Sequence, residues 1–300
     1  MYLMLHYMQE WYKCVWVYAC FGTLREIGGS LATLTENVGS NHDRANRGFM
    51  AKAAFLLRIM VIASFAAWLF RSILFAPYYV PSSSMMPTLR EGDFFIASRW
   101  DFGVSPRSFA SFAPDYPRLF ADLPERGDIV VFSPRAKPGV NFVKRVIGLP
   151  GDTISMEAGI VSINGEKVDH QRIADFIAPL EGDVSCVVVP YVVDQRALTK
   201  GGAAGCRFSR DVETLPDGTS FAVLDIAPAL SDYVEPFSVP QGKVALFGDN
   251  RDDSLDSRFS VAMGGIGLVD ADRLLGKMRF VIGRDAEGAR FVGTRAFAAD

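Results

Sequence analysis

The segment AAFLLRIMVIASFAAWLFRSILFA, Ala53 to Ala76, decides the fold because it separates a short N-terminal part from a longer, strand-rich part. About 24 residues rising 1.5 Å each give roughly 36 Å of helix, which is enough to cross a bilayer with some tilt. Arg58 and Arg71 lie near its ends, where long side chains reach the headgroups. The pattern predicts one transmembrane helix over 53–76. A buried core helix is the alternative.

The cations that flank this segment predict its direction. Those that precede or open it are Arg44, Arg47, Lys52 and Arg58. Beyond its middle, Arg71 is the only cation before Arg90. The positive-inside rule therefore predicts a cytoplasmic N-terminus and an extracytoplasmic C-terminal part. We expect residues 1–52 to form a cytoplasmic extension. Met50-Ala51-Lys52 resembles an ordinary start, so a mis-assigned start before Met50 is the other interpretation.

Composition disfavours several classes of protein. The net charge is only -3, and no basic stripe is present, which argues against nucleic-acid binding. The four cysteines form no CxxC pair and only three histidines occur, so no metal or other cofactor is expected. Cys186 and Cys206 form a disulfide or remain two free thiols; the sequence leaves this open.

Beyond the anchor, short runs rich in β-forming residues alternate with turn residues, and long amphipathic helical patterns are absent. This predicts a mainly β protein in which an antiparallel sheet follows the single helix. The expected strands lie within 93–98, 127–132, 142–148, 158–165, 186–193, 220–227 and 243–249.

The segment YYVPSSSMMPTLREGD, Tyr78 to Asp93, places three serines directly behind the anchor. A serine hydroxyl needs a base to become a nucleophile. After the anchor, the only histidine is His170, in the polar stretch GEKVDHQR, which disfavours a Ser-His-Asp triad.

A lysine can act as the base if burial keeps its amine neutral. In FVKRVIG, alternation puts Lys144 on one strand face with Phe142 and Val146, and Arg145 on the opposite face, where we expect it to reach solvent. The alternative is an edge strand with two ordinary surface cations.

Three motifs occur in order: PSSSMMPTLREGD; RGDIVVF (Arg126–Phe132) with VKRVIGLPGD; and GDNRDDSLDSR (Gly248–Arg258). Together with the anchor they resemble the signature boxes of type I signal peptidases, the Ser/Lys-dyad family S26 that includes bacterial leader peptidase. The resemblance extends to about Lys277. It implies a membrane-bound serine endopeptidase of the bacterial inner membrane, with a periplasmic or extracytoplasmic catalytic domain, that removes signal peptides from exported preproteins.

The resemblance also implies roles for individual residues. Ser84 is the expected nucleophile, Lys144 the general base, and Ser82 a donor to the oxyanion hole. The expected supporting residues are Ser254, which would hydrogen-bond the lysine, and the ion pair of Asp256 with Arg258. Departures from the family pattern are Ser83 in place of glycine, Asp253 in place of asparagine, and Ser260-Val261 in place of an aromatic residue and glycine.

Family members bind the substrate as an added strand and select small residues before the cut. The corresponding pocket residues here are Tyr78, Val80, Leu89, Phe142 and Val143, for which core packing is the alternative. The resemblance further implies a catalytic core over 77–151 and 244–283, an inserted β subdomain over 152–243, and a loose tail over 284–300.

Two other functions stay open at this stage. A specialised relative would mature one substrate, such as a conjugative pilin. A catalytically silent, membrane-tethered β-module would only bind exported chains.

Overall fold

A computed structural model describes residues 41–103, 118–179, 187–188, 191–192, 196–198, 202, 204–285 and 288–293. The chain divides into two compact units, Met1–Ser64 and Phe65–Asp300.

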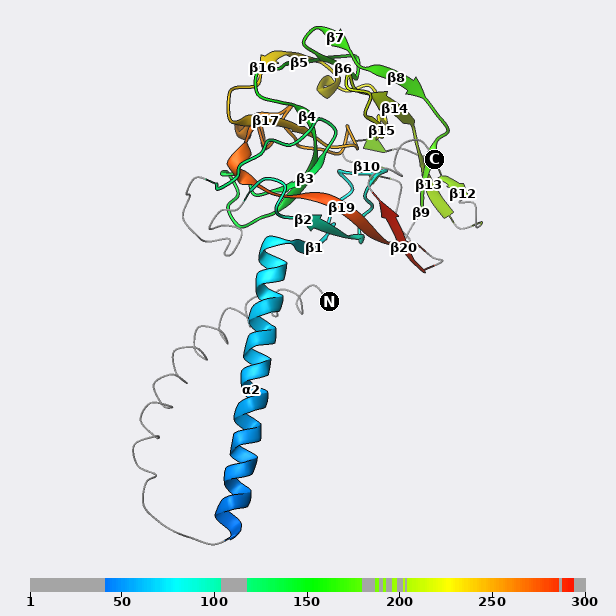
Figure 1. The fold of residues 1–300 in the computed structure, drawn as a ribbon. Coiled ribbons are helices and arrows are strands. Elements are labelled where there is room, and N and C mark those ends of the chain that lie inside the picture. Colours follow the sequence, from blue (N-terminus) through cyan, green and yellow to red (C-terminus); the bar gives the residue numbers. More distant parts are fainter. Residues whose placement is uncertain are drawn as a thin grey trace. The chain divides into compact units, whose positions relative to one another are not determined.

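The long helix α2 spans Asn41–Ile73 (Figure 1). Its stretch Lys52–Phe70 has a mean hydropathy of 2.1 and is not buried by the rest of the protein, so it is long and apolar enough to cross a membrane. The helix ends earlier than the predicted Ala76. Ala76 instead lies in strand β1 (Phe75–Tyr79), opposite Ala97. Pro77 explains the difference, because the residue before a proline disfavours the helical conformation.

The largest sheet is antiparallel and has eight strands, in the order β1-β2-β19-β3-β4-β17-β18, with β20 paired to β19 (Figure 1). The remaining bounds are β2 Phe94–Ser98, β3 Ile129–Phe132, β4 Phe142–Gly148, β17 Lys243–Phe247, β18 Val269–Asp270, β19 Leu274–Asp285 and β20 Gly288–Gly293. The predicted mainly β fold behind one apolar helix is confirmed.

The tail is not the loose end that the sequence analysis expected. Strand β19 continues to Asp285, and β20 pairs with it antiparallel, with Arg284 opposite Ala289. Phe291 and Val292 are residue types that favour an extended strand, and β20 gains backbone hydrogen bonds by pairing with β19. Residues 294–300 lie outside the described part.

Between β4 and β17 in the chain, the described residues form four smaller antiparallel sheets: β16-β5-β6-β7, β15-β14-β8, β12-β13-β9 and β10-β11. Their strands are β5 Thr153–Glu157, β6 Ile160–Ile163, β7 Glu166–Lys167, β8 Asp169–Arg172, β9 Phe176–Pro179, β10 Val187–Val188, β11 Tyr191–Val192, β12 Arg196–Leu198, β13 Ala204–Phe208, β14 Arg210–Thr214, β15 Ser220–Leu224 and β16 Val234–Ser238. The boundary of an inserted subdomain at 152–243 stays a prediction. Cys206 is disulfide-bonded, and Cys186 lies outside the described residues.

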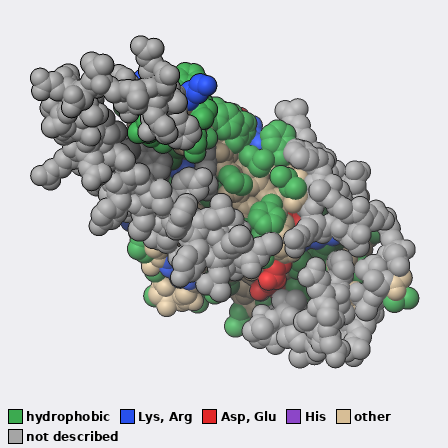
Figure 2. Space-filling view, turned by 90° about the horizontal axis from the view of Figure 1, so that it is seen from below, with side chains coloured by type: hydrophobic (Ala, Val, Ile, Leu, Met, Phe, Trp, Pro, Cys, Tyr) green, Lys and Arg blue, Asp and Glu red, His purple; other side chains and the backbone are tan. Residues whose placement is uncertain are grey.

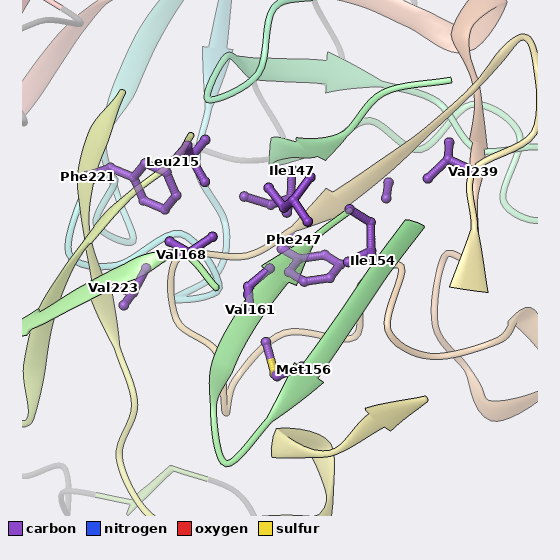
Figure 3. Packing of buried hydrophobic residues seen from close by; sticks show 12 residues of the cluster. Ile147, Ile154, Met156, Val161, Val168, Leu215, Phe221, Val223, Val239 and Phe247 are labelled. Atoms are coloured by element: carbon purple, nitrogen blue, oxygen red, sulfur yellow. The ribbon is translucent and has the colours of Figure 1, made fainter. Parts of the chain in front are cut away.

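One hydrophobic cluster joins the large sheet to the smaller sheets (Figure 3). Ile147 of β4 and Phe247 of β17 pack with Ile154, Met156 and Val161 of β5 and β6. Each of these side chains is at most 4% exposed. Burying an aliphatic or aromatic side chain of this size contributes about 1.5–3 kcal/mol. The shared core therefore fixes the end of β4, which lies within the second motif, and the end of β17, which leads into the third motif.

Hydrophobic side chains also remain exposed. Figure 2 shows them on the face it views, with few charged side chains among them. On the apolar span, Phe55, Met60 and Ile62 are each more than 60% exposed. A surface of this kind on a helix fits a lipid environment better than water.

Candidate active site

Ser84 lies in the loop between β1 and β2, residues 80–93, called the nucleophile loop below. The two ends of the loop are tied together, because Val80 and Asp93 share a backbone hydrogen bond of 2.9 Å, and Gly92 N–H donates to Val80 C=O at 2.9 Å. Val80, Met85 and Leu89 have no exposed surface and pack in a cluster with Phe95 and Met278. These three apolar side chains thus anchor a loop whose serines stay at least partly exposed.

Lys144 lies on β4, opposite Val130 of β3, and is only 4% exposed. Its Nζ is hydrogen-bonded to Ser84 Oγ. The two residues are 60 positions apart in the chain, and strand pairing brings them together. Val146, on the same strand face, is fully buried, as the alternation predicted.

The pKa of the Lys144 amine is lowered to about 8, because burial, together with the Arg258 charge, outweighs the carboxylates of Asp256, Asp249 and Asp253, which raise it. At pH 7 about a tenth of such amines are neutral, compared with about 0.03% of ordinary lysines. This amine can therefore accept a proton from the Ser84 hydroxyl near neutral pH.

Ser82 lies beside the same hydroxyl. Its Oγ is 3.3 Å from Ser84 Oγ, and the side chain faces solvent. The neighbouring Ser83 donates its hydroxyl hydrogen to Asp253 Oδ2 in the loop 248–258, called the third-box loop below. The three consecutive serines thus differ in their contacts: Ser82 faces solvent beside Ser84, Ser83 binds Asp253, and Ser84 is hydrogen-bonded to Lys144.

Asp256 and Arg258 form a buried two-point ion pair beside the lysine. Arg258 Nε donates to Asp256 Oδ1 at 2.9 Å and Nη2 donates to Oδ2 at 3.0 Å. Both side chains are at most 1% exposed. Burial alone would raise the pKa of Asp256, but the Arg258 charge and hydrogen bonds outweigh it, and the pKa lies below its ordinary value. Asp256 Oδ2 also accepts the Gly248 N–H at 2.9 Å.

The expected hydrogen bond from Ser254 to the lysine is not formed. Ser254 Oγ is buried and has no hydrogen-bond partner among the described residues. The side chain instead packs against Gly248, where an added Cβ would lie 2.3 Å from Ser254 Oγ and 2.5 Å from Ser84 C=O. Lys144 Nζ is hydrogen-bonded to Ser84 Oγ instead. The role of Ser254 stays a prediction.

We expected Arg145 to reach solvent, but its guanidinium is buried. Its side chain is 6% exposed and forms an ion pair of 2.6 Å with Asp249, which is 1% exposed. Its Nη2 also donates to Thr88 Oγ1 at 3.3 Å, and its guanidinium lies 4.1 Å from the centre of the Phe221 ring.

This buried network joins all three motifs, and the sequence analysis missed it. Asp249 supplies the carboxylate, and Thr88 donates its hydroxyl to the same group. The sequence signal that could have predicted the network is the Asp249 carboxylate in the third motif, because a buried arginine requires such a partner.

The five predicted pocket residues differ in exposure. Val80 and Leu89 are fully buried in the core cluster, so neither presents a surface to a substrate here. Tyr78 and Val143 are partly exposed and pack on the same cluster, and Phe142 packs on a neighbouring one. Direct substrate contact by these residues stays a prediction.

Among the described residues, one group of carboxylates has a spacing that a metal ion requires. Atoms of Asp225, Asp232 and Asp252 lie within 4.8 Å of one another. Two of these groups are already occupied by protein donors: Asp252 Oδ2 accepts the N–H groups of Ile226 and Ala227, and Asp232 Oδ2 accepts that of Ala229.

A sequence model of the family described as "Signal peptidase, peptidase S26" matches residues 53–283. The chain belongs to this family. Signal peptidase I of Rickettsia felis is 30% identical over 82% of this chain and 83% of the relative. The enzyme of Rickettsia canadensis is 32% identical over 72% of this chain and 74% of the relative. A crystal structure of a signal peptidase I from Enterococcus faecalis covers 52% of this chain and 97% of its own, at 23% identity and a TM-score of 0.26.

Membership of the signal peptidase family establishes the reaction class. The protein is a serine endopeptidase that cleaves signal peptides, and its substrates are therefore preproteins. The family is membrane-bound, in agreement with the candidate span Lys52–Phe70.

Proposed function

We propose that this signal peptidase cleaves with a Ser84–Lys144 dyad. The observation that carries the proposal is the hydrogen bond between Ser84 Oγ and a lysine amine that is 4% exposed. Burial disfavours the ammonium form, and a neutral amine is the form that removes a proton.

In the acylation step, Ser84 Oγ attacks the carbonyl carbon of the scissile peptide bond and its proton moves to Lys144 Nζ. The carbonyl oxygen becomes an oxyanion, for which the Ser82 hydroxyl and the Ser84 N–H are the proposed donors. Such donors each contribute about 3–4 kcal/mol to transition-state stabilisation in related chemistry. The C–N bond then breaks, the Lys144 proton passes to the leaving amine, and the signal peptide remains as an ester on Ser84.

In the deacylation step, a water molecule gives its proton to Lys144 Nζ and attacks the ester carbon. Collapse of the second tetrahedral intermediate returns the proton to Ser84 Oγ and releases the signal peptide with a free carboxylate. The base thus starts and ends each cycle as a neutral amine. The buried Asp256–Arg258 pair holds the third-box loop beside the amine, and its carboxylate favours the ammonium form more strongly than its guanidinium disfavours it.

We further propose that the substrate binds as an extended strand with small residues before the cut, and that the N-terminus faces the cytoplasm of a bacterial cell. Four cations before or at the start of the span support this orientation: Arg44, Arg47, Lys52 and Arg58. Only a few residues separate the span from Ser84, so cleavage would take place close to the outer surface of the membrane.

The dyad is tested by cleavage of a purified preprotein by the full-length chain in detergent. We expect Ser84→Ala and Lys144→Met each to lower kcat by at least 10³-fold, because each removes one half of a unit that acts together. Exposed residues give matched controls: Ser238→Ala and Lys167→Met should retain activity. Substantial cleavage by either dyad variant would overturn the proposal.

A further inference from the structure

Ser83 and Asp253 connect the nucleophile loop to the third-box loop. Ser83 Oγ donates to Asp253 Oδ2, and Asn250 Nδ2 donates to Ser83 C=O at 3.3 Å. The backbone continues the connection, because Asn250 N–H donates to Ser84 C=O at 3.2 Å. The hydroxyl that holds Asp253 therefore belongs to the residue next to the nucleophile.

The charged side chains that act on the Lys144 amine all come from one element. Arg258 and the carboxylates Asp249, Asp253 and Asp256 all lie on the third-box loop, and Lys144 itself lies on β4. Each carboxylate favours the ammonium form, and the arginine disfavours it. The balance between them decides how much of the amine is neutral at a given pH.

Two of these three carboxylates are neutralised by arginines. Asp256 pairs with Arg258 at 2.9 Å and Asp249 pairs with Arg145 at 2.6 Å. Asp253 differs: within the part of the chain that the structure describes, it forms no ion pair, and a neutral hydroxyl holds its carboxylate. Its negative charge raises the pKa of the amine by less than those of Asp256 and Asp249, but it is the one of the three that no arginine holds within the described residues.

We propose that Asp253, held by Ser83, is a positioning residue that adjusts the protonation of the Lys144 amine and so sets the pH range in which the peptidase works. This rests on the proposed role of Lys144 as the base. The Ser83 hydroxyl fixes the direction of the Asp253 carboxylate and leaves its charge in place. An arginine or lysine in place of Ser83 would neutralise that charge. The charge of Asp253 then offsets part of the effect of burial on the amine.

The test is the pH profile of kcat and KM for preprotein cleavage by the full-length chain in detergent. Asp253→Asn keeps an oxygen that accepts the Ser83 hydrogen and removes the charge. We expect the acidic limb of the kcat profile to move to lower pH, so that activity well below the limb midpoint rises roughly two- to tenfold with KM little changed. Asp122→Asn, at an exposed position, is the control and should leave the profile unchanged.

The contribution of Ser83 is tested by repeating the comparison in a Ser83→Ala background. We expect a smaller shift there, because the carboxylate is no longer held. An unmoved limb in Asp253→Asn, or a limb that moves to higher pH, would overturn the proposal. An equal shift in both backgrounds would overturn the role of Ser83. The variant Lys144→Met distinguishes failure of this proposal from failure of the dyad. If Lys144→Met still cleaves the preprotein, Lys144 is not the base. If Lys144→Met is inactive, the pH profile of Asp253→Asn decides on the role of Asp253.

Discussion

At the scale of single residues, the chemistry depends on how β4 places two adjacent cations. Lys144 faces Ser84 and forms no ion pair with any residue that the structure describes, whereas Arg145 is neutralised by Asp249 at 2.6 Å. Arginine keeps its proton when buried, and lysine loses it readily. The order Lys-Arg therefore puts the group that can become neutral beside the serine and the permanent cation in an ion pair.

The lowered pKa of Lys144 predicts the pH dependence of wild-type catalysis. Protonation of the amine removes the base, so kcat/KM should fall about tenfold per pH unit below a midpoint near 8. Steady-state cleavage of a preprotein between pH 6 and 10 measures this. A profile that keeps rising with slope one up to pH 10 would mean that the amine behaves as an ordinary lysine.

The same shift predicts a gain in stability when the amine is removed. The folded-state pKa lies below the unfolded value, so the unfolded chain binds more protons between about pH 8 and 10.5, and the buried amine destabilises the fold most below pH 8. We expect Lys144→Met to have a Tm equal to or above that of the wild type at pH 7, with the advantage lost by pH 10. Thermal unfolding in detergent at both pH values measures it, and a lower Tm at pH 7 would contradict the prediction.

The motifs pointed to Ser84 and Lys144, strand alternation pointed to the lysine, and the structure brings the two side chains into contact, while their catalytic roles stay a prediction. Sequence reasoning misplaced Arg145, because alternation shows that a side chain is on the other face but not that this face is covered. Phe221 and Asp249 cover it, and they lie 76 and 104 positions away in the chain. Such long-range partners cannot be predicted from local pattern.

At the scale of elements, the third-box loop is held from two sides. The nucleophile loop binds it through Asn250, and β15 binds it through Leu224, whose N–H donates to Asp249 C=O at 2.8 Å and whose C=O accepts the Arg251 N–H at 2.9 Å. Beside this, Arg251 pairs with Glu213 of β14 at 2.6 Å, with both side chains at most 4% exposed. The smaller sheets thus help to position the loop that faces the lysine.

This buried pair predicts a large effect of a small change. Glu213→Gln leaves the Arg251 charge buried without its counter-ion, which typically destabilises a fold by about 3–5 kcal/mol. We expect a clearly lower Tm, together with lower kcat because the third-box loop is less well held. Glu166→Gln, at an exposed position, is the control for the loss of a carboxylate. Equal Tm values for the two variants would refute the prediction.

Element positions were predictable where a short run of β-forming residues lies between two turns, as in β2, β3, β4 and β17. The helix end was not, because the apolar run continues through Ala76 while pairing with β2 converts its last residues into a strand. Strand β20 was missed for a similar reason. Its pairing with the long β19 is a tertiary contact, and the run Gly288–Gly293 alone carries a weak signal.

At the scale of the whole molecule, ionisable groups outside the active site also determine how stability depends on pH. Burial, together with the carboxylates of Asp232 and Asp252, raises the pKa of Asp225 to about 6. The folded protein therefore holds this proton more tightly than the unfolded chain, whose carboxyl has its ordinary value of 3.8. The ionised group destabilises the fold above about pH 6, and this effect disappears below about pH 4.

Asp225→Asn should consequently raise the Tm at pH 8 and have little effect at pH 4. Thermal unfolding of the full-length chain across this range measures the difference, with Asp122→Asn as an exposed control. A variant that is less stable than the wild type at pH 8 would show that Asp225 has a stabilising partner or ligand under those conditions.

The account depends most on the protonation state of one amine. Its most direct measurement is an NMR titration of full-length protein with isotope-labelled lysine side chains in detergent, in which the Lys144 signal is assigned by its loss in Lys144→Met. We predict a midpoint near pH 8, well below the ordinary lysine value of 10.5. A midpoint near 10.5 would contradict the Ser84–Lys144 mechanism.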